Sequence, residues 1–321
     1  MSDTLTPTRP TTLLPLLAIG VTVVMWASAF VAIRFVGREF SAGSLSLGRL
    51  VTASAVLGLL LLLRRPAPGG AGSGWPTGRG WWAVVVCGVT WFGVYNVALN
   101  EAERRIDAGT ASMLVNIGPI LIAVLAGWLL REGFPRGLLI GGGIAFAGVV
   151  VIGLGSSSGG VADTWGVVLC VVAAICYAIG VVSQKPLLSR VSPLRVTWLA
   201  CTVGVVVCLP FAPTLVTELG DASSAGIWWL VYLGIGPTAL AFTTWAFALA
   251  RTSAGKQGAT TYLVPPMVIA MAWVLLGETP AGIAVIGGVI CLTGVYLTRR
   301  RHRGTPELDD RSPGDAPKIS T

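Results

Sequence analysis

Polar and aromatic side chains recur at helical spacing inside long apolar stretches of this 321-residue chain. Trp91 and Tyr95 stand four residues apart, and so do Ser112 and Asn116, so each pair shares one face of a helix. Hydroxyl and amide groups beside aromatic rings are the usual chemistry of a small-molecule site. The residues that we expect to line such a cavity are Trp26, Ser28, Trp91, Tyr95, Asn96, Asn116, Tyr177, Gln184, Trp245, Thr261 and Tyr262.

An alternative interpretation is that these side chains join helices to one another. Ser, Thr, Asn and Gln commonly form hydrogen bonds across the interfaces of membrane helices. For any single Ser or Thr the helix-joining interpretation is favoured. Cavity lining and helix joining are equally supported for four residues, namely Tyr95, Asn96, Asn116 and Trp245.

Five further residues are candidates for a structural or hinge role. Arg49 lies about one turn inside an apolar stretch, where it either binds an anionic substrate group, pairs with acidic residues of the same side or reaches the lipid headgroups. Pro119 and Pro265 each bend a helix, either as a hinge or as a fixed kink. Glu132 and Glu278 sit at helix ends, where a capping or loop-ordering role is expected.

The sequence offers no catalytic or metal-binding cluster. The six cysteines lie in apolar runs without a CxxC pair, and the only histidine, His302, lies in a basic tail. We therefore expect no catalytic residue, no metal and no cofactor, and an intramembrane enzyme is disfavoured. No Asp or Glu lies near the middle of an apolar stretch, so the usual carboxylate proton relay is missing and neutral or zwitterionic cargo is favoured.

The composition is that of a membrane protein. Hydrophobic residues make up 54% of the chain and charged residues 11%, against a usual charged share of about 25%. This balance excludes an ordinary cytosolic enzyme, a disordered chain and a nucleic-acid binder. It predicts an all-α membrane protein, monomeric or homodimeric, whose partners are the lipid bilayer and a small-molecule substrate. The ten expected transmembrane helices are 13–33, 44–63, 81–100, 108–130, 137–154, 165–184, 194–213, 226–249, 256–276 and 281–298.

The basic residues are sorted by side. With a cytoplasmic N-terminus, 17 of the 22 Lys and Arg fall in cytoplasmic segments and five fall outside. Lys and Arg concentrate on the cytoplasmic side of membrane proteins. The count predicts a multi-pass protein of the cell (inner) membrane with both termini in the cytoplasm.

The chain contains an internal repeat at an offset of 146 residues. Pro119 meets Pro265 and Glu132 meets Glu278 without a gap. Each copy holds five expected helices, and because five is odd the second copy must be inverted, which is typical of secondary transporters. The expected organisation is a cytoplasmic tail (1–12), a first repeat (13–154), a second repeat (165–298) and a basic, polar cytoplasmic tail (299–321).

Glycines recur in the fifth and tenth expected helices. Small residues let the backbones of two membrane helices approach closely. We expect these two helices to be packing or dimer-facing elements through Gly141, Gly142, Gly148, Gly287, Gly288 and Gly294.

The pattern Ala-Gly-x9-Pro-x12-Glu, at 108–132 and again at 254–278, resembles the EamA family of the drug/metabolite transporter superfamily. Trp26-Ala-Ser-Ala-Phe30 in the first stretch supports the resemblance, which covers about residues 13–298. It implies ten transmembrane helices as two inverted five-helix repeats, a central cavity, and export or exchange of small metabolites, with amino acids and their analogues as the best-known cargo.

Three functional hypotheses follow. The first is an inner-membrane transporter that exports or exchanges small metabolites by alternating access, with amino acids or analogues as cargo. The alternatives are a flippase-like carrier of lipid-linked sugars or polyprenols, which the superfamily also contains, and, more remotely, a non-transporting membrane receptor.

Overall fold

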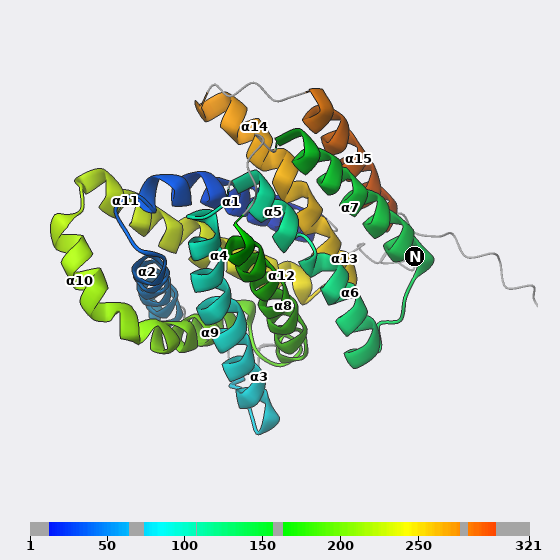
Figure 1. Cartoon of the computed structure of the whole chain (residues 1–321). Helices are drawn as coiled ribbons and strands as arrows, with labels where there is room; N and C mark the ends of the chain where they lie inside the picture. Colours follow the sequence, from blue (N-terminus) through cyan, green and yellow to red (C-terminus); the bar gives the residue numbers. More distant parts are fainter. Residues whose placement is uncertain (1–12, 64–73, 107, 157–162, 277–281, 300–321) are drawn as a thin grey trace, which may run out of the picture.

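The computed structural model describes residues 13–63, 74–106, 108–156, 163–276 and 282–299. Every secondary-structure element within these ranges is a helix (Figure 1). Glu278, the expected N-terminal tail (1–12) and residues 300–321 of the expected C-terminal tail lie outside the described residues.

The helices fall into ten groups that correspond to the ten apolar stretches. In chain order they are α1 (Leu13–Val36); α2 (Ala42–Leu63); α3, η1 and α4 (Arg79–Cys87, Gly88–Val94, Tyr95–Glu103); α5 and α6 (Ala108–Val115, Gly118–Leu129); α7 (Arg136–Ser156); α8 (Thr164–Leu187); α9, η2 and α10 (Pro193–Cys208, Leu209–Phe211, Ala212–Asp221); α11, η3 and α12 (Ser224–Leu233, Gly234–Leu240, Ala241–Leu249); α13, η4 and α14 (Ala254–Gly258, Ala259–Leu263, Val264–Leu276); and α15 (Gly282–Arg299).

Six of these groups are long and apolar enough to cross a membrane: α1, α2, α3–α4, α8, α9–α10 and α11–α12. Large apolar side chains cover the outside of the molecule, and Leu62, Trp128 and Val274 are all more than 70% exposed, at 85%, 74% and 77%. A soluble protein rarely presents such a surface, because exposed apolar area in water is unfavourable. This apolar surface is suited to contact the hydrocarbon core of a lipid bilayer.

The irregular elements repeat with the sequence. The wide-turn π-helices η1 (Gly88–Val94) and η3 (Gly234–Leu240) occupy positions that an offset of 146 superimposes residue for residue, and the same offset superimposes α4 on α12. π-Helical turns are rare and frequently mark functional sites. Their recurrence shows that the two halves share local geometry as well as residue types.

Pro119 and Pro265 divide helices that the sequence predicted to be continuous. Pro119 is the second residue of α6 and follows a two-residue turn at 116–117, and Pro265 is the second residue of α14 and follows the 3-10 helix η4. Proline lacks a backbone N–H and restricts the residue before it, so a new helix begins at the proline more easily than an old one continues. Asn116 lies at the first of these breaks.

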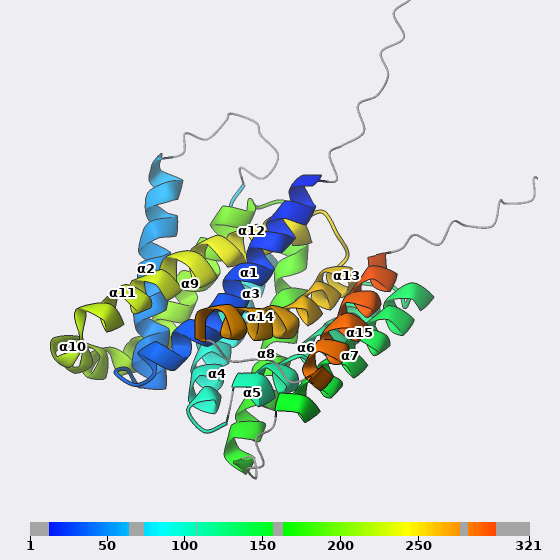
Figure 2. The ribbon, with the colours of Figure 1, turned by 90° about the horizontal axis from the view of Figure 1, so that it is seen from above.

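α7 and α15 pack directly against each other (Figures 1 and 2). A Cβ on Gly141 would stand 2.7 Å from the Gly294 carbonyl oxygen, and one on Gly148 would stand 2.7 Å from the Gly287 carbonyl oxygen. The helices are antiparallel, because the contact position in α15 moves back from 294 to 287 as the position in α7 moves forward from 141 to 148. Because the 146-residue offset pairs Gly141 with Gly287 and Gly148 with Gly294, the two contacts are reciprocal, as in a two-fold interface.

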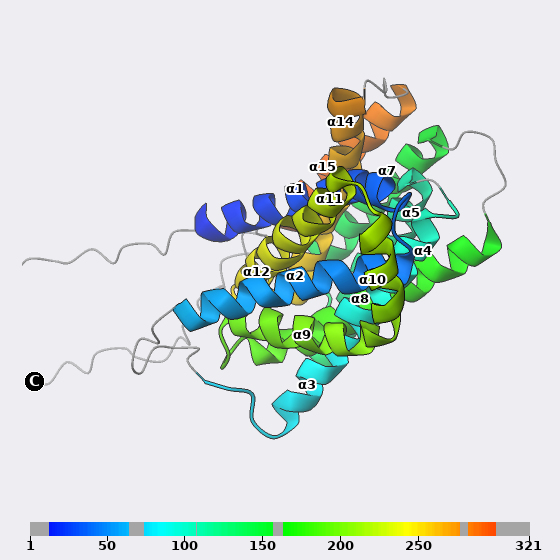
Figure 3. The same ribbon diagram turned by 90° about the vertical axis from the view of Figure 1, so that its left-hand side faces the viewer.

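The seventh group is longer than the predicted helix 194–213. Pro210 and Pro213 interrupt the backbone hydrogen bonds after α9, and α10 then continues to Asp221. Figure 3 shows α10 turned away from the direction of α9. A short hydropathy window ends at such a turn and therefore places the boundary too early.

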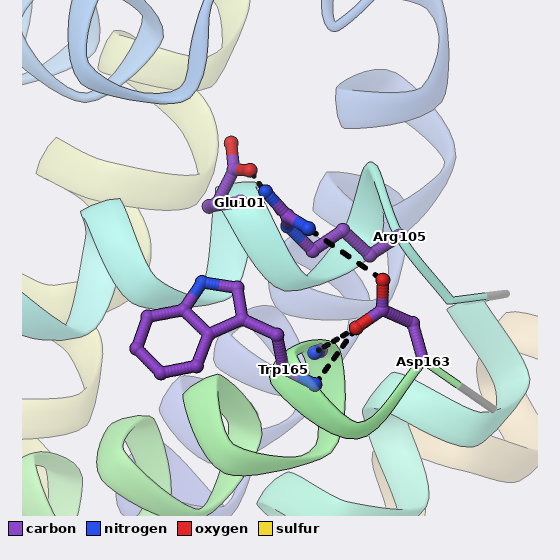
Figure 4. A network of polar contacts seen from close by, with 5 residues as sticks. Glu101, Arg105, Asp163 and Trp165 are labelled. Carbon is purple, nitrogen blue, oxygen red and sulfur yellow. Dashed lines mark hydrogen bonds and ion pairs between the residues drawn. The ribbon is translucent and has the colours of Figure 1, made fainter.

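α8 begins on a side-chain cap. Asp163 Oδ1 accepts hydrogen bonds from the backbone N–H groups of Trp165 (2.7 Å) and Gly166 (3.1 Å), and Arg105, paired with Glu101, lies 3.5 Å from Asp163 Oδ2 (Figure 4). The hydrogen bond from Gly166 is the main influence that lowers the pKa of the Asp163 carboxyl below its usual value. A carboxylate at a helix N-terminus satisfies free N–H groups and the helix dipole.

These contacts define two ends of the molecule. α4 ends near the start of α8, and Arg34 at the end of α1 lines a recess together with Glu103 and Arg104; we call this the Arg34 end. α8 ends beside the end of α12 and the start of α13, and we call this the Lys185 end.

Candidate functional site

A cavity of about 60 Å³ lies in the middle of the helices. Its wall is built from both halves of the chain, by α1, α2, η1, α4 and the α5–α6 break of the first half and by α8, α12, η4 and α14 of the second. The lining residues are Trp26, Ala29, Phe30, Ile33, Arg49, Trp91, Tyr95, Leu99, Glu103, Val115, Asn116, Tyr177, Phe242, Thr261 and Val264.

Aromatic rings from four helical groups meet at one end of this cavity. The Trp26 ring centroid lies 5.3 Å from that of Phe242 and 6.2 Å from that of Trp91, and Trp91 lies 5.2 Å from Tyr177. We call Trp26, Trp91, Tyr177 and Phe242 the aromatic cluster. Tilted and edge-to-face contacts of this kind stabilise a rigid apolar surface.

Two glycines make room for the aromatic cluster. A Cβ on Gly118 would stand 2.6 Å from Cδ1 of Tyr177, and one on Gly180 would collide with the Trp91 side chain. Gly118 opens α6 directly after the break at Asn116, so the broken helix lets the Tyr177 ring approach its backbone. The absence of a side chain at Gly118 and Gly180 therefore allows the Tyr177 and Trp91 rings to take their places in the cavity wall.

Arg49 enters the cavity from α2 and is held by η3. The side chain is only 4% exposed, and its Nε donates a 3.0 Å hydrogen bond to the Thr238 hydroxyl oxygen. The Thr238 hydroxyl in turn donates to the Leu233 carbonyl oxygen, five residues earlier, at 2.7 Å. In the π-helical turn, the Thr238 side chain points toward the Arg49 guanidinium. An ordinary α-helical turn would direct this side chain elsewhere.

Glu103 is a cavity residue that the sequence analysis missed. Counted by hydropathy it belongs to an outer acidic segment, but the structure places it at the last turn of α4, on the cavity wall. Both carboxylate oxygens are buried, and neither forms a hydrogen bond within the described part of the chain. Its place on the helix face of Tyr95 and Leu99, eight and four residues earlier, is the sequence signal that could have identified it.

The cavity continues toward the Arg34 end. A recess of about 310 Å³ is lined by Arg34, Arg38, Arg104 and Asn100, and it shares Ile33 and Glu103 with the cavity. Glu103 therefore stands where the recess meets the cavity. A recess lined mainly by positive side chains raises the local concentration of solutes that carry a negative group.

Partly buried hydrogen bonds close the Lys185 end. Lys185 Nζ donates to the carbonyl oxygens of Leu249 (2.7 Å) and Thr252 (2.6 Å), which lie at the end of α12. The Glu132 carboxylate accepts hydrogen bonds from the backbone N–H groups of Ala254 (2.7 Å) and Gly255 (3.2 Å), at the start of α13. Glu132 of the first half therefore caps a helix of the second half, as its position at a helix end suggested.

Six of the expected cavity residues line the cavity, and Arg49 lines it with them. Tyr95 and Tyr177 approach each other with ring centroids 6.2 Å apart, and the Asn116 amide nitrogen donates to the Ser112 carbonyl oxygen at 2.6 Å. The Asn116 amide oxygen is buried and has no hydrogen bond within the described chain. The six are Trp26, Trp91, Tyr95, Asn116, Tyr177 and Thr261.

Two expected residues bond to helices and do not line the cavity. Ser28 shares a 2.7 Å hydrogen bond with the Tyr232 hydroxyl, which joins α1 to α11. The Asn96 amide nitrogen donates to the Phe92 carbonyl oxygen at 2.8 Å, within the turns that leave η1. Ser28 therefore follows the helix-joining alternative, whereas Asn96 bonds within its own helical group and joins no second helix.

Three further expected residues also stand away from the cavity. Trp245 lies behind Trp26, with ring centroids 5.0 Å apart. Tyr262 packs with Phe146 of α7, and Gln184 is fully buried one residue before Lys185. Helical periodicity could not separate these residues from lining ones, because a helix packed on all sides has several buried faces.

The described residues contain no cluster of three or more His, Cys, Asp or Glu side chains placed to hold a metal ion. The arrangement instead offers hydrogen bonding, charge and aromatic surface to a small molecule.

Comparison with known proteins agrees with this geometry. The profile of the EamA-like transporter family matches residues 13–154 and 164–300. A probable terminal-alkyne amino-acid exporter of Streptantibioticus cattleyicolor is 36% identical over 287 residues, which cover 89% of this chain and 94% of that protein. A probable amino-acid metabolite efflux pump of Salmonella typhimurium is 26% identical over 215 residues, or 64% of this chain and 72% of the pump.

A solved crystal structure shares the fold. Its TM-score is 0.69 at 20% sequence identity, and the match covers 89% of this chain and 96% of the other. The match of the family profile to both halves, the exporter relatives and the apolar helical exterior lead to one conclusion. The chain belongs to the EamA-like transporter family and is a multi-pass membrane transporter of small molecules.

Proposed function

We propose that this protein exports or exchanges amino acids or their analogues across the cell membrane by alternating access. The observation that carries the proposal is the central cavity, which is built from both halves, has a recess at the Arg34 end and is closed by hydrogen bonds at the Lys185 end. A cavity that is closed at one end and continues toward the other is what an alternating-access carrier requires.

The proposal includes an inverted arrangement of the two halves. The shared 146-residue offset of η1 and η3 supports the repeat, and the reciprocal contacts of antiparallel α7 and α15 support a two-fold relation between its copies. In such a protein, exchange of the two conformations between the halves converts a state open to one side into a state open to the other.

We further propose that both termini are cytoplasmic and that the Lys185 end faces the cytoplasm. The 17 Lys and Arg assigned to that side, against five on the other, support this orientation. The structure then represents a carrier that is closed inside, with the recess on the outer side.

The names of the relatives support amino acids as the cargo. Two of them are named as an amino-acid exporter and an amino-acid metabolite efflux pump. An aromatic cluster beside Arg49, Asn116 and Glu103 suits a small molecule that has both polar and apolar parts.

Transport into proteoliposomes tests the proposal. Radiolabelled amino acids are offered singly to vesicles that contain the wild-type protein, Trp91→Ala or Trp128→Ala. Trp128 is the matched control because its ring lies on the outer surface, 74% exposed. We expect wild type and Trp128→Ala to move at least one amino acid and Trp91→Ala to lose about tenfold or more in rate, since it removes part of the cavity wall. Wild-type transport by Trp91→Ala, or no transport of any amino acid by wild type, would contradict the proposal.

A further inference from the structure

We propose that Arg49 and Glu103 together bind the charged main-chain part of one amino acid, with the carboxylate on Arg49 and the ammonium on Glu103. The inference rests on the proposed function and deepens it, because it names zwitterionic amino acids with small apolar side chains as the cargo and assigns the two residues that select them.

The Arg49 guanidinium has capacity left for a ligand. Its Nε is engaged by Thr238, but the two terminal nitrogens form no hydrogen bond or ion pair among the described residues. A guanidinium carries five N–H donors in a planar fork that matches a carboxylate. Because the side chain is 4% exposed and lines the cavity, a carboxylate placed there would be shielded from water.

Glu103 presents the complementary group. Both of its oxygens are buried without a hydrogen bond, and a buried polar group in that condition is unfavourable. The positive charges of Arg49 and Arg34 act on this carboxylate, but neither lies within ion-pair distance of it in the described chain. An ammonium, with three N–H donors, would supply the missing partners.

One zwitterion answers both requirements at once. Arg49 and Glu103 line the same cavity without contacting each other, so a molecule that carries both charges can lie between them. A cation alone or an anion alone would satisfy only one of the two buried groups. The structure therefore favours a ligand whose opposite charges lie close together.

The size of the cavity agrees with an amino acid. At about 10–15 Å³ for each water-sized position, 60 Å³ holds roughly four to six such positions. Every α-amino acid has five main-chain heavy atoms. The aromatic cluster lines the same cavity and offers a side chain mainly apolar ring surface, with the Trp26 Nε1 and the Tyr177 hydroxyl as its buried polar atoms. A small apolar side chain is thus the kind that the cavity can take.

Binding of four related ligands to purified protein in detergent tests the inference. L-valine carries both charges, valinamide only the cation, N-acetylvaline only the anion, and isobutylamine lacks the carboxylate altogether. We expect the wild-type protein to bind valine about tenfold or more tightly than any of the other three, because each of those leaves a buried charge without its partner.

Two variants separate the roles. Glu103→Gln is expected to weaken valine binding about tenfold and leave N-acetylvaline within about twofold. Arg49→Gln is expected to weaken valine binding about tenfold and leave valinamide within about twofold. Glu101→Gln, two residues from Glu103 and paired with Arg105, and Arg195→Gln, the repeat counterpart of Arg49 placed over Trp75, are matched controls that should bind all four ligands as wild type does.

The outcomes distinguish this inference from the proposed function. If valine is transported but binds no better than valinamide and N-acetylvaline, or if each variant weakens all four ligands equally, the assignment of Arg49 and Glu103 is wrong and amino-acid transport still stands. If wild type neither binds nor transports any amino acid, the proposed function fails and the inference fails with it. Thermal unfolding of each variant shows whether a loss of binding reflects loss of fold.

Discussion

At the residue scale, Arg49 donates a hydrogen bond to one hydroxyl from the other half of the chain, that of Thr238. Its repeat counterpart, Arg195, lies outside the cavity with its guanidinium 4.9 Å from the ring centroid of Trp75. Equivalent arginines therefore have different surroundings in the two halves. Thr238, the acceptor of Arg49, occupies the position that Phe92 holds in the first repeat, so no equivalent hydroxyl stands there.

Thr238→Val tests this positioning. The variant keeps the shape of the side chain but removes the acceptor of Arg49, and a hydrogen bond to a charged group contributes about 1.5–3 kcal/mol. We expect amino-acid binding, measured as Kd on purified protein, to weaken about tenfold. Thr243→Val is the control, because that hydroxyl donates only to the Ala239 carbonyl oxygen of its own helix. Equal affinities of the two variants would show that Thr238 does not position Arg49.

At the element scale, α7 and α15 approach so closely that backbone meets backbone. A Cβ on Gly148 would stand 2.5 Å from the Cys291 backbone nitrogen, whereas one on Gly142 would have no neighbour within 4 Å. The sequence predicted packing or dimer contacts for these glycines, and the structure shows that Gly141, Gly148 and Gly294 pack within the chain.

Two alanine substitutions in α7 should therefore have opposite effects on stability. Gly148→Ala forces the helices apart, and overpacking of this kind costs about 1–3 kcal/mol. Gly142→Ala adds a methyl group in open space, where alanine favours a helix over glycine by up to about 1 kcal/mol. Thermal unfolding in detergent measures both. A Tm for Gly148→Ala at or above that of Gly142→Ala would contradict the packing.

At the scale of the whole molecule, the two ends differ. The Lys185 end is held by contacts that join the halves, from Glu132 to the start of α13 and from Lys185 to the end of α12. At the Arg34 end, Arg34 lines an open recess. Loss of the contacts at the Lys185 end should favour opening there.

Glu132→Ala tests this expectation. Loss of a helix cap costs about 1 kcal/mol, which corresponds to roughly a fivefold change in population. In an Asn116→Cys background, we expect a membrane-impermeant thiol reagent added on the Lys185 side to label the cavity several times faster when Glu132 is replaced. Glu101→Ala, at the opposite end, should leave the rate unchanged. Labelling of the chain without the Asn116→Cys substitution gives the background rate. This rate is expected to be low, since the six native cysteines are buried or half-buried. Equal labelling of the two variants would show that Glu132 does not hold this end closed.

The sequence by itself determined the membrane environment, the ten helical groups and the repeat, because these depend on local composition, on periodicity and on residues at a fixed offset. It also indicated Trp26, Trp91, Tyr95, Asn116, Tyr177 and Thr261, since polar and aromatic groups are rare enough in apolar helices to be conspicuous. It did not separate them from Ser28 or Tyr262, which have the same residue types and the same spacing.

Only the tertiary structure decided which of these side chains meet. A side chain's direction depends on where helices break, where π-turns occur and which neighbours close over it, and these are long-range properties. Glu103 reads as a loop residue in the sequence but faces Arg49's cavity at the end of α4, and Thr238 reads as one threonine among several but holds that arginine. The cavity's charge therefore comes from packing between segments that are far apart in the chain.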